Sequence, residues 1–528
     1  MKLAPDQLPD DPILLKQMLA AMMEQAAQKD TQIMTLKSAN HHKQVRIDHL
    51  ELIVKMMQGR QFGRSSEESA QLNLLHEEAE VLEADLAQTQ AILDQQNGQT
   101  PKSAKPNRTR KPFPAELERL VQNDEPASCD CPACGAAMTQ VGEDVSEVLD
   151  VVPAKYRVIR MVRPKYGCKG CNQIAQAPAQ ERVIDRGTAS ANLIAQVIVD
   201  KYADHLPLYR QAERFERSGI DLDRSTLAGW VGRVSGTLYP LVNAIRDHIK
   251  AGVKLHADET PAPTLSPGKG KTHTGYYWAY VRDDSPFKGD AAPAVWFQYS
   301  DSRKGIEPAK HLSGYCGAIQ ADAYAGYNTL ISKGAARAGC WAHVRRKFVE
   351  LVKLNPDSPA SKVVVLVNQL YDVERAIKGS PPEERMRRRR ELSEPIIDIL
   401  KALLDEQIKN CLKKSPLANA IQYARKQWDE LVRYVDDGHL EIDNNAAERA
   451  IRPLAVGRKN HLFAGSAAGG ETGAIMYTLM GTAKLNGIDP LAYLTAVLKR
   501  INNTPITAVT ELLPWNIDLE EAKYAEAI

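Results

Sequence analysis

Two pairs of closely spaced cysteines constrain the fold of this chain most strongly, because one tetrahedral metal ion can bring both pairs together. Cys131 and Cys134 form one C-x2-C pair, and Cys168 and Cys171 form the second after 33 intervening residues. Four thiolates at this spacing are typical of a structural zinc site. The sequence between the pairs is rich in β-branched residues and alternates between apolar and polar positions, which predicts a small β-hairpin. We therefore expect residues 121–180 to form a four-cysteine module that holds one Zn²⁺.

The cysteine content also indicates the compartment. The chain has 528 residues, eight cysteines and a polar N-terminal segment that does not resemble a signal peptide. We expect a reducing, cytoplasmic setting, where clustered cysteines bind metals rather than form disulfides. Cys129 lies just outside the first pair and is left out of the predicted ligand set. No apolar run approaches the roughly 20 residues that a membrane span needs, so no membrane partner is expected.

The N-terminal region carries a heptad pattern. Apolar residues occupy most a and d positions between Ile13 and Met57, without an intervening proline or glycine. A stripe this narrow is buried against another helix, and Asn40 at an a position is the kind of residue that fixes register. We expect residues 1–95 to form a coiled coil that makes the protein at least a dimer. The alternative is a single amphipathic helix that packs on its own chain.

A linker and a helical region frame the cysteine module. Residues 96–120 are rich in proline and basic side chains, which is typical of a flexible tether. Residues 181–250 predict helices, with a stop at Gly219 and a cap at Asp223 or Ser225 before the last one. Two short helices around such a turn resemble a helix-turn-helix, although a structural bundle gives the same pattern. The predicted DNA contacts in this region are Arg224, Ser225 and Thr226.

From residue 253 onward, the sequence predicts strands that end in acidic residues. VKLHADET predicts a strand ending in Asp258, and GAIQADAYAGYN predicts another ending in Asp322. Three strands followed by alternating strands and helices indicate a mixed sheet covered by helices, within a multidomain α + α/β protein. Acids at the carboxyl ends of strands line active-site crevices in such sheets. Glu259 is an alternative ligand to Asp258.

A third acid comes from the segment EIDNNAAERAIRP. Asp443 and Glu448 compete for this role, and Asp443 is better explained as a helix N-cap. Clustered carboxylates repel one another, and a divalent cation removes that cost. Oxygen-only ligands favour Mg²⁺ or Mn²⁺, and two such ions clamp a phosphodiester for in-line attack. We therefore expect two Mg²⁺ or Mn²⁺ ions at this site.

The motifs around these acids resemble a known family. HADETP, QADAYAGY, GCWAHVRRKF, DNNAAERAIRP and GAIMYTLMGTAKLNGIDPLAYL are similar to the transposases of the insertion sequence 66 family, over nearly the whole chain. The resemblance implies a ribonuclease H-like core with a DDE triad, carried over to Asp258, Asp322 and Glu448. It places the core at residues 251–468, with a helical insertion at about 355–435 and a C-terminal helical region at 469–528.

The resemblance also implies the activity. A transposase of this kind binds the terminal inverted repeats of its insertion sequence, cleaves the element ends and joins the 3′-OH ends to target DNA. The partners would be double-stranded DNA at the bacterial nucleoid, and accessory proteins encoded by the same element. The alternative from another class is a non-catalytic DNA-binding regulator with a zinc ribbon, a helix-turn-helix and a degenerate core. A third interpretation is a structural scaffold built on the N-terminal helices.

Basic residues near the acids are candidate DNA contacts, since phosphate contacts dominate affinity for duplex DNA. Those near the second and third acids are His343, Arg345, Arg346, Arg449 and Arg452. The run formed by Arg385 and residues 387–390 is either a solvated helix face or a DNA-facing patch. Cys340, within GCWAHVRRKF, is expected to be a buried core thiol rather than a ligand.

Overall fold

The computed structural model describes residues 155–167, 169, 174–178, 182–266, 268–332 and 334–519, together with Lys29 and Arg119. Apart from Lys29 and Arg119, the predicted coiled coil and the basic linker lie outside the described residues. The four predicted zinc ligands lie outside them too. The chain divides into two compact units, one of residues 99–180 and one of residues 1–98 with 181–528. Each unit is described by itself.

The smaller unit contains a short antiparallel hairpin. Its strands are β1 (Lys165–Gly167) and β2 (Ile174–Gln176). Side chains extend the pairing, because Arg163 donates to the backbone oxygen of Ala177 at 3.1 Å and Gln176 donates back to that of Arg163 at 3.0 Å. Residues 155–164 form no strand. The described hairpin brackets the second cysteine pair, and residues 135–154, most of the segment between the pairs where the sequence predicts a hairpin, lie outside the described residues.

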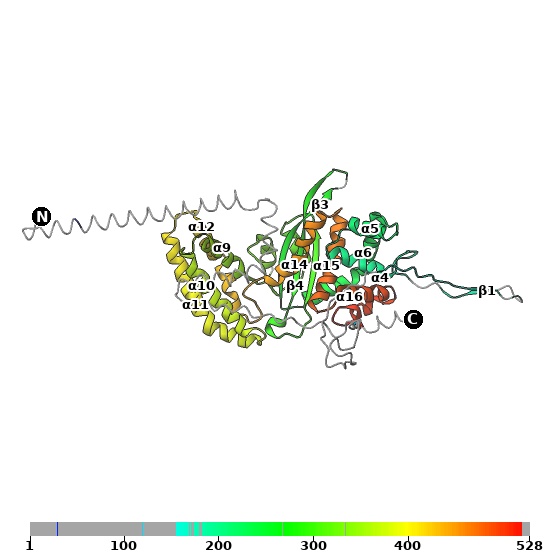
Figure 1. Cartoon of the computed structure of the whole chain (residues 1–528). Coiled ribbons are helices and arrows are strands. Elements are labelled where there is room, and N and C mark those ends of the chain that lie inside the picture. Colours follow the sequence, from blue (N-terminus) through cyan, green and yellow to red (C-terminus); the bar gives the residue numbers. More distant parts are fainter. Residues whose placement is uncertain are drawn as a thin grey trace, which may run out of the picture. The chain divides into compact units, whose positions relative to one another are not determined.

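A mixed sheet forms the centre of the larger unit (Figure 1). Its five strands lie in the order β5 (Ala294–Ser300), β4 (Lys271–Arg282), β3 (Lys254–Ser266), β6 (Ala318–Gln320) and β7 (Arg337–Ala338). β5, β4 and β3 pair antiparallel, and β3, β6 and β7 pair parallel. The sheet confirms the expected mixed α/β architecture.

One strand is longer than predicted. The prediction that the strand from residue 253 ends at Asp258 is wrong, because β3 continues to Ser266 against an antiparallel partner, β4. Pro261 and Pro263 obscured this continuation, since proline cannot donate to a sheet and argues against a central strand. The parallel pairing with β6 extends only to His256, so both prolines lie beyond it. Asp258 therefore lies two residues beyond the last parallel pair of β3 and β6.

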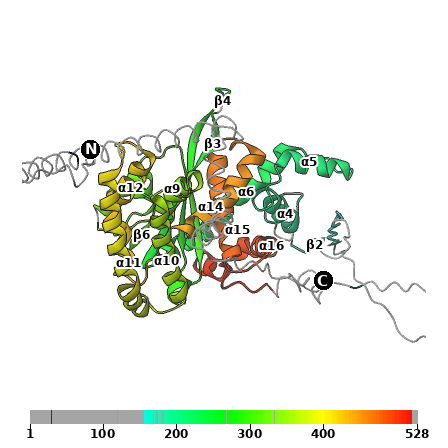
Figure 2. The same ribbon diagram turned by 60° about the vertical axis from the view of Figure 1, so that its left-hand side comes forward.

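Helices cover both faces of the sheet, as Figures 1 and 2 show. One core is formed with α4 (Ala191–Tyr202), α6 (Arg224–Lys250), α15 (Ala467–Leu485) and α16 (Pro490–Arg500). A second core is formed with α9 (Trp341–Leu354), α10 (Ala360–Ile377), α11 (Pro382–Asn410), α12 (Pro416–Lys426) and α13 (Trp428–Val432). α14 (Asn445–His461) lies against β3 and β4.

Shorter elements connect these layers. They are α5 (Leu208–Arg217), α7 (Ile306–His311) and α8 (Asn328–Ile331), with the 3-10 turns η2 (Ser285–Phe287), η3 (Ala325–Tyr327), η4 (Arg433–Val435), η5 (Ile501–Asn503) and η6 (Ile506–Leu512). Among the helices of the described ranges, none is long and apolar enough to cross a membrane.

The turn before α6 follows the sequence prediction. Gly219, after α5, has a φ of +74°, a conformation that glycine adopts without a steric penalty. Asp223 is the N-cap of α6, since its carboxylate accepts the backbone N–H groups of Ser225 at 2.7 Å and Thr226 at 3.0 Å. α6 then runs for 27 residues and packs on β5 and α15. Its C-terminal part is therefore structural, while its first turn is exposed.

The C-terminal helix α15 covers the outer edge of β5. The N–H of Phe297 donates to Thr478 Oγ1 at 2.9 Å, and Val295 exchanges hydrogen bonds with Thr482 Oγ1 at 3.2 and 3.0 Å. Small residues allow this approach, because a Cβ on Gly481 would lie 2.6 Å from Val295 Cγ1. The threonine hydroxyls satisfy backbone groups that an uncovered edge strand would leave open for further pairing.

The basic run of the insertion is partly internal, which corrects the expectation of a solvated or DNA-facing surface. Arg389 is 0% exposed and binds both carboxylate oxygens of Glu374, at 2.7 and 2.6 Å. Arg385 is also buried. Arg389 donates to three backbone oxygens of the segment that leads out of the insertion, those of Tyr434, Asp437 and Leu440. The outer members of the run, Arg387, Arg388 and Arg390, pair with surface acids.

Candidate active site

Asp258 and Asp322, two of the predicted acids, lie at equivalent positions of two neighbouring chain segments. His256 of β3 is opposite Gln320 of β6 in parallel register. Asp258 and Asp322 each follow two residues later, and side chains two residues apart share one face of a strand. Asp322 lies just after β6, where its Oδ1 accepts the N–H of Tyr324 at 2.9 Å. The register therefore brings the two aspartates to the same edge of the sheet.

The next parallel strand, β7, ends opposite the last residue of β6. Ala338 of β7 is opposite Gln320, and Cys340 follows two residues later as the N-cap of α9. Cys340 is 3% exposed, as expected for a core thiol. Burial, followed by the negative charges of Glu448 and Asp443, raises the pKa of the Cys340 thiol well above its ordinary value. The thiol thus lies close to the third predicted acid.

Glu448 lies in the first turn of α14, and Asn444 fixes where that helix begins. The Asn444 side chain donates to the backbone oxygen of Ala257 at 2.9 Å, and its Oδ1 lies 3.1 Å from His256 Nδ1. Its backbone N–H donates to Cys340 Sγ at 3.3 Å. One residue therefore attaches the start of α14 to β3 and to the start of α9.

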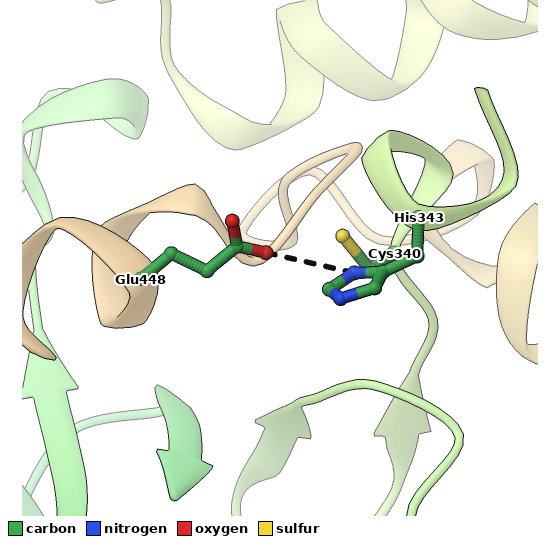
Figure 3. Close-up of side chains that lie close together, drawn as sticks. All are labelled: Cys340, His343 and Glu448. Atoms are coloured by element: carbon green, nitrogen blue, oxygen red, sulfur yellow. Dashed lines mark ion pairs between the residues drawn. The ribbon is translucent and has the colours of Figure 1, made fainter. Parts of the chain in front are cut away.

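Two residues of α9 lie within 4 Å of the Glu448 carboxylate, and Figure 3 shows one of them, His343. His343 Nδ1 lies 3.5 Å from Glu448 Oε1, and an Arg346 guanidinium nitrogen lies 3.8 Å from Oε2. Burial, then the positive charge of Arg346, lowers the pKa of His343 to about 4. His343 is therefore neutral at pH 7, so its contact with Glu448 is not a charge pair there.

The three predicted acids are close enough for the charges of Asp322 and Glu448 to affect the pKa of Asp258. Burial, followed by the charges of Glu259, Glu448 and Asp322, raises the pKa of Asp258 well above its usual range. Burial is the larger cause, and the neighbouring carboxylates add to it because like charges disfavour ionisation. A site of this kind is stabilised by a divalent cation with oxygen ligands.

Glu259 is engaged elsewhere. Its Oε1 accepts from Arg303 at 2.9 and 2.6 Å, and its Oε2 accepts from the Tyr327 hydroxyl at 3.1 Å. Burial and the charge of Asp322 raise the pKa of Glu259 to about 6, against the opposing effect of Arg303. Because both oxygens already have partners, Asp258 is the better ligand of the two.

The predicted N-cap role of Asp443 is wrong by one residue, because the N-cap of α14 is Asn444 and Asp443 precedes it. The two carboxylate oxygens of Asp443 accept the backbone N–H of Asn445 at 3.1 Å and the Asn445 side-chain amide at 3.0 Å. Burial raises the pKa of Asp443. Pro453 lies inside α14 and does not end it, since the helix continues to His461.

A buried network that the sequence analysis missed supports this edge of the sheet. Glu441 accepts from Lys254 and lies 3.0 Å from His256 Nε2. Burial would raise the pKa of Glu441, but Lys254 and His256 hold it well below its ordinary value. Gln320 bonds both the N–H and the C=O of Glu441. The segment before α14 is therefore fixed against β3 and β6.

The structure separates the predicted DNA contacts into groups. Arg346, Arg449 and Arg452 lie on α9 and α14 near Glu448, and Arg449 is exposed. Arg345 is only 4% exposed and donates to Asn368 at 2.8 Å, which corrects its predicted role as a DNA contact. Arg224, Ser225 and Thr226 open α6, on a different element from the acids. Cys131, Cys134, Cys168 and Cys171 lie outside the described residues.

Family models match most of the chain. The model described as Transposase IS66 family matches residues 186–472, and the zinc-finger binding domain of transposase IS66 matches residues 128–172. The IS66 C-terminal element matches residues 478–515, and the model described as Transposase C of IS166 homeodomain matches residues 49–121.

Curated relatives agree over nearly the full length. Uncharacterized protein y4qI of Sinorhizobium fredii (strain NBRC 101917 / NGR234) is 38% identical over 532 residues, which cover 96% of this chain and 97% of the relative. Uncharacterized protein y4jD of the same strain is 41% identical over 414 residues, 76% of this chain and 81% of the relative. These matches confirm the resemblance seen in the motifs. The chain belongs to the IS66 family of transposases.

Proposed function

We propose that this transposase cleaves the ends of its insertion sequence and joins the freed 3′-OH ends to target DNA, with Asp258, Asp322 and Glu448 as metal ligands. The observation that carries the proposal is the convergence of these acids. The register of β3 and β6 aligns the aspartates, and the charges of Glu448 and Asp322 help to raise the pKa of Asp258. These carboxylates are far apart in sequence but close in space, so they repel one another unless they share a bound cation.

The fold supports the same proposal. The sheet order, with β3 at its centre and only β4 running against the other strands, is consistent with the ribonuclease H-like core that the family resemblance implies. The helices from α10 to α13 lie between the second and third acids in sequence, as a helical insertion would. The first acid thus belongs to the central strand, and the third to a helix that packs on it.

The donor set fits a hard divalent cation. Three carboxylates offer oxygen ligands only, which suits Mg²⁺ or Mn²⁺ rather than zinc. When bound, two such ions would stabilise the attacking and leaving oxygens of a phosphodiester. Asn444 and the Glu441 network hold Glu448 close to the aspartates, so the ligand geometry depends on buried contacts rather than on exposed loops.

The surrounding residues bind and orient DNA in this proposal. Arg346, Arg449 and Arg452 would contact phosphates beside the scissile bond, and His343 would line the same site. Arg224, Ser225 and Thr226 at the exposed start of α6 would contribute to recognition of the inverted repeats. The four-cysteine module with one Zn²⁺ would assist, and the coiled coil of residues 1–95 would pair two protomers on the two ends.

Substitution of single acids tests the catalytic proposal. Asp258→Asn, Asp322→Asn and Glu448→Gln should each lower Mg²⁺-dependent strand transfer about a thousandfold, since each removes several kcal/mol of transition-state stabilisation. Binding to end DNA should remain. Asp290→Asn is the matched control, because Asp290 is exposed and lies in the loop before β5. A non-catalytic regulator would show no Mg²⁺-dependent transfer in the wild type, and full transfer by Asp258→Asn would refute the assignment.

A further inference from the structure

A second group of donor atoms adjoins the three acids. One ligand atom each from Cys340, His343 and Glu448 lies within 4.8 Å of the others (Figure 3). His343 Nδ1 and Glu448 Oε1 are 3.5 Å apart. In a tetrahedral zinc site, with metal–ligand distances of about 2.0–2.3 Å, neighbouring ligand atoms lie roughly 3.3–3.8 Å apart. The nitrogen and the oxygen already have that separation.

The backbone holds these three donors in place. Cys340 caps α9 and His343 follows three residues later, so the two side chains lie on one face of the helix start. Glu448 comes from the first turn of α14. The backbone N–H of Asn444 donates to Cys340 Sγ at 3.3 Å, and it thereby joins the two helix starts. A hydrogen bond to a ligand sulfur is typical of the support around metal sites.

The burial of His343 Nδ1 is a separate observation that points to a metal ligand. His343 Nδ1 is buried and has no hydrogen-bond partner among the described residues. A buried polar nitrogen without a partner is destabilising, and it needs an explanation such as an ion. The His343 side chain as a whole is 26% exposed, so solvent can reach the site from that side. A fourth ligand from water would complete a tetrahedron.

We propose that Cys340, His343 and Glu448 form a second metal site that is selective for Zn²⁺ and that Zn²⁺ bound there inhibits the transposase. A thiolate and an imidazole select zinc over Mg²⁺, which prefers oxygen ligands. Glu448 is shared, and a carboxylate drawn into the zinc site cannot complete the Mg²⁺ site with the two aspartates. The zinc site stands on its own donor geometry, whereas the inhibition rests on the proposed function.

Cobalt absorption tests the site without an activity assay. The full-length protein is prepared with zinc in its four-cysteine module and then titrated with Co²⁺. One further equivalent should produce a thiolate-to-cobalt charge-transfer band. Cys340→Ser should abolish this band, and His343→Ala should weaken Co²⁺ binding at least tenfold. Cys316→Ser, at an exposed free cysteine, is the matched control and should keep the band. A wild type without the band, or a band that persists in Cys340→Ser, overturns the site.

Zinc inhibition tests the coupling to catalysis. Strand transfer at saturating Mg²⁺ is measured against Zn²⁺, with each variant compared with its own zinc-free rate. Cys340→Ser should raise the half-inhibitory Zn²⁺ concentration at least tenfold, and Cys316→Ser should leave it unchanged. An intact cobalt band without zinc inhibition overturns the coupling alone. Full transfer by Asp258→Asn would instead refute the proposed function, while the cobalt band of that variant would still report on the zinc site.

Discussion

The side chain of Asn444 donates a 2.9 Å hydrogen bond to the backbone oxygen of Ala257, the residue immediately before Asp258. Asn444 is 1% exposed and stands at the N-terminus of the helix that carries Glu448. Its backbone N–H also bonds Cys340 Sγ. The relative placement of the first and third acids therefore depends on one buried amide.

Removing that amide should impair catalysis more than DNA binding. Asn444→Ala leaves the Ala257 oxygen and His256 Nδ1 without this partner, and a lost buried hydrogen bond of this kind costs about 1–3 kcal/mol of stability. We expect strand transfer to fall at least tenfold, with end binding retained. Asn419→Ala, at an exposed position of α12, is the control and should change neither. Wild-type transfer by Asn444→Ala would show that the amide does not position Glu448.

The buried pair of Lys254 and Glu441 should be sensitive to the loss of one partner. Lys254 is 1% exposed and contacts the Glu441 carboxylate. Lys254→Met removes the cation beside the Glu441 carboxylate, which is 20% exposed and keeps its contact with His256, at a cost of up to about 3–5 kcal/mol. The double variant Lys254→Met/Glu441→Gln should recover most of this loss. Urea unfolding of the three proteins measures the difference, and equal stability of the single variant and the wild type would contradict it.

The same pair has a defined pH dependence. Lys254 and His256 hold the pKa of Glu441 well below its ordinary value, despite the opposing effect of burial. The stabilisation is therefore complete above the unfolded-state pKa, near pH 4.5, and is lost as the pH falls towards the folded-state pKa. The double variant should lack this acid-limb loss, which unfolding curves between pH 5 and pH 3 would detect.

Neutralising an acid of the site should stabilise the metal-free protein. Burial and the neighbouring carboxylates raise the pKa of Asp258, so the folded state loses stability as the pH rises above about 4. Glu259, with a pKa of about 6, adds to this loss between about pH 4.5 and pH 6. Asp258→Asn should raise the melting temperature at pH 7 without metal, and Mg²⁺ should stabilise only the wild type. A lower melting temperature of the variant would argue against charge crowding.

The insertion should loosen when its internal arginine is removed. Arg389→Met removes the bidentate cation of Glu374, which keeps a 3.5 Å contact with Arg385, at a cost of up to about 3–5 kcal/mol. Hydrogen exchange should accelerate at residues 434–440, whose backbone oxygens Arg389 binds. Arg387→Met is the matched control, because Arg387 is exposed and a surface pair contributes about 0–1 kcal/mol. Unchanged exchange in Arg389→Met would contradict the role of this arginine.

Local sequence patterns predicted the secondary-structure elements, whereas long-range contacts determined their extent and packing. Asp258 and Asp322 could be proposed because an apolar strand signal leads into each, and Glu448 because residues that favour a helix start precede it. The extension of β3 could not, since Pro261 and Pro263 argue against a strand until an antiparallel partner covers the other side. The burial of Arg389 left a signal that was overlooked. It lies four residues after Arg385 and in phase with the buried stripe of Ile397, Leu400 and Leu404.

Most of the contacts that support the site could not be predicted from the sequence. Glu441 meets Lys254 across 187 positions of chain, and no local period links them. Cys340 was expected to be only a core thiol, and its burial agrees with that. Its proximity to Glu448 depends on how β7 and α14 pack, which only the folded chain reveals. Polar residues just before a helix, such as Asn444, are the one sequence signal that pointed towards this region.

Iron-directed cleavage tests the central claim most directly. Fe²⁺ replaces Mg²⁺ in the full-length protein, and hydroxyl radicals generated at the ion cut the backbone beside its ligands. The account predicts three groups of cuts, near residues 258, 322 and 448, all suppressed by excess Mg²⁺ and weakened together in Asp258→Asn. Cuts at the two aspartates without any near Glu448, or cuts that Mg²⁺ does not suppress, would contradict a shared metal site.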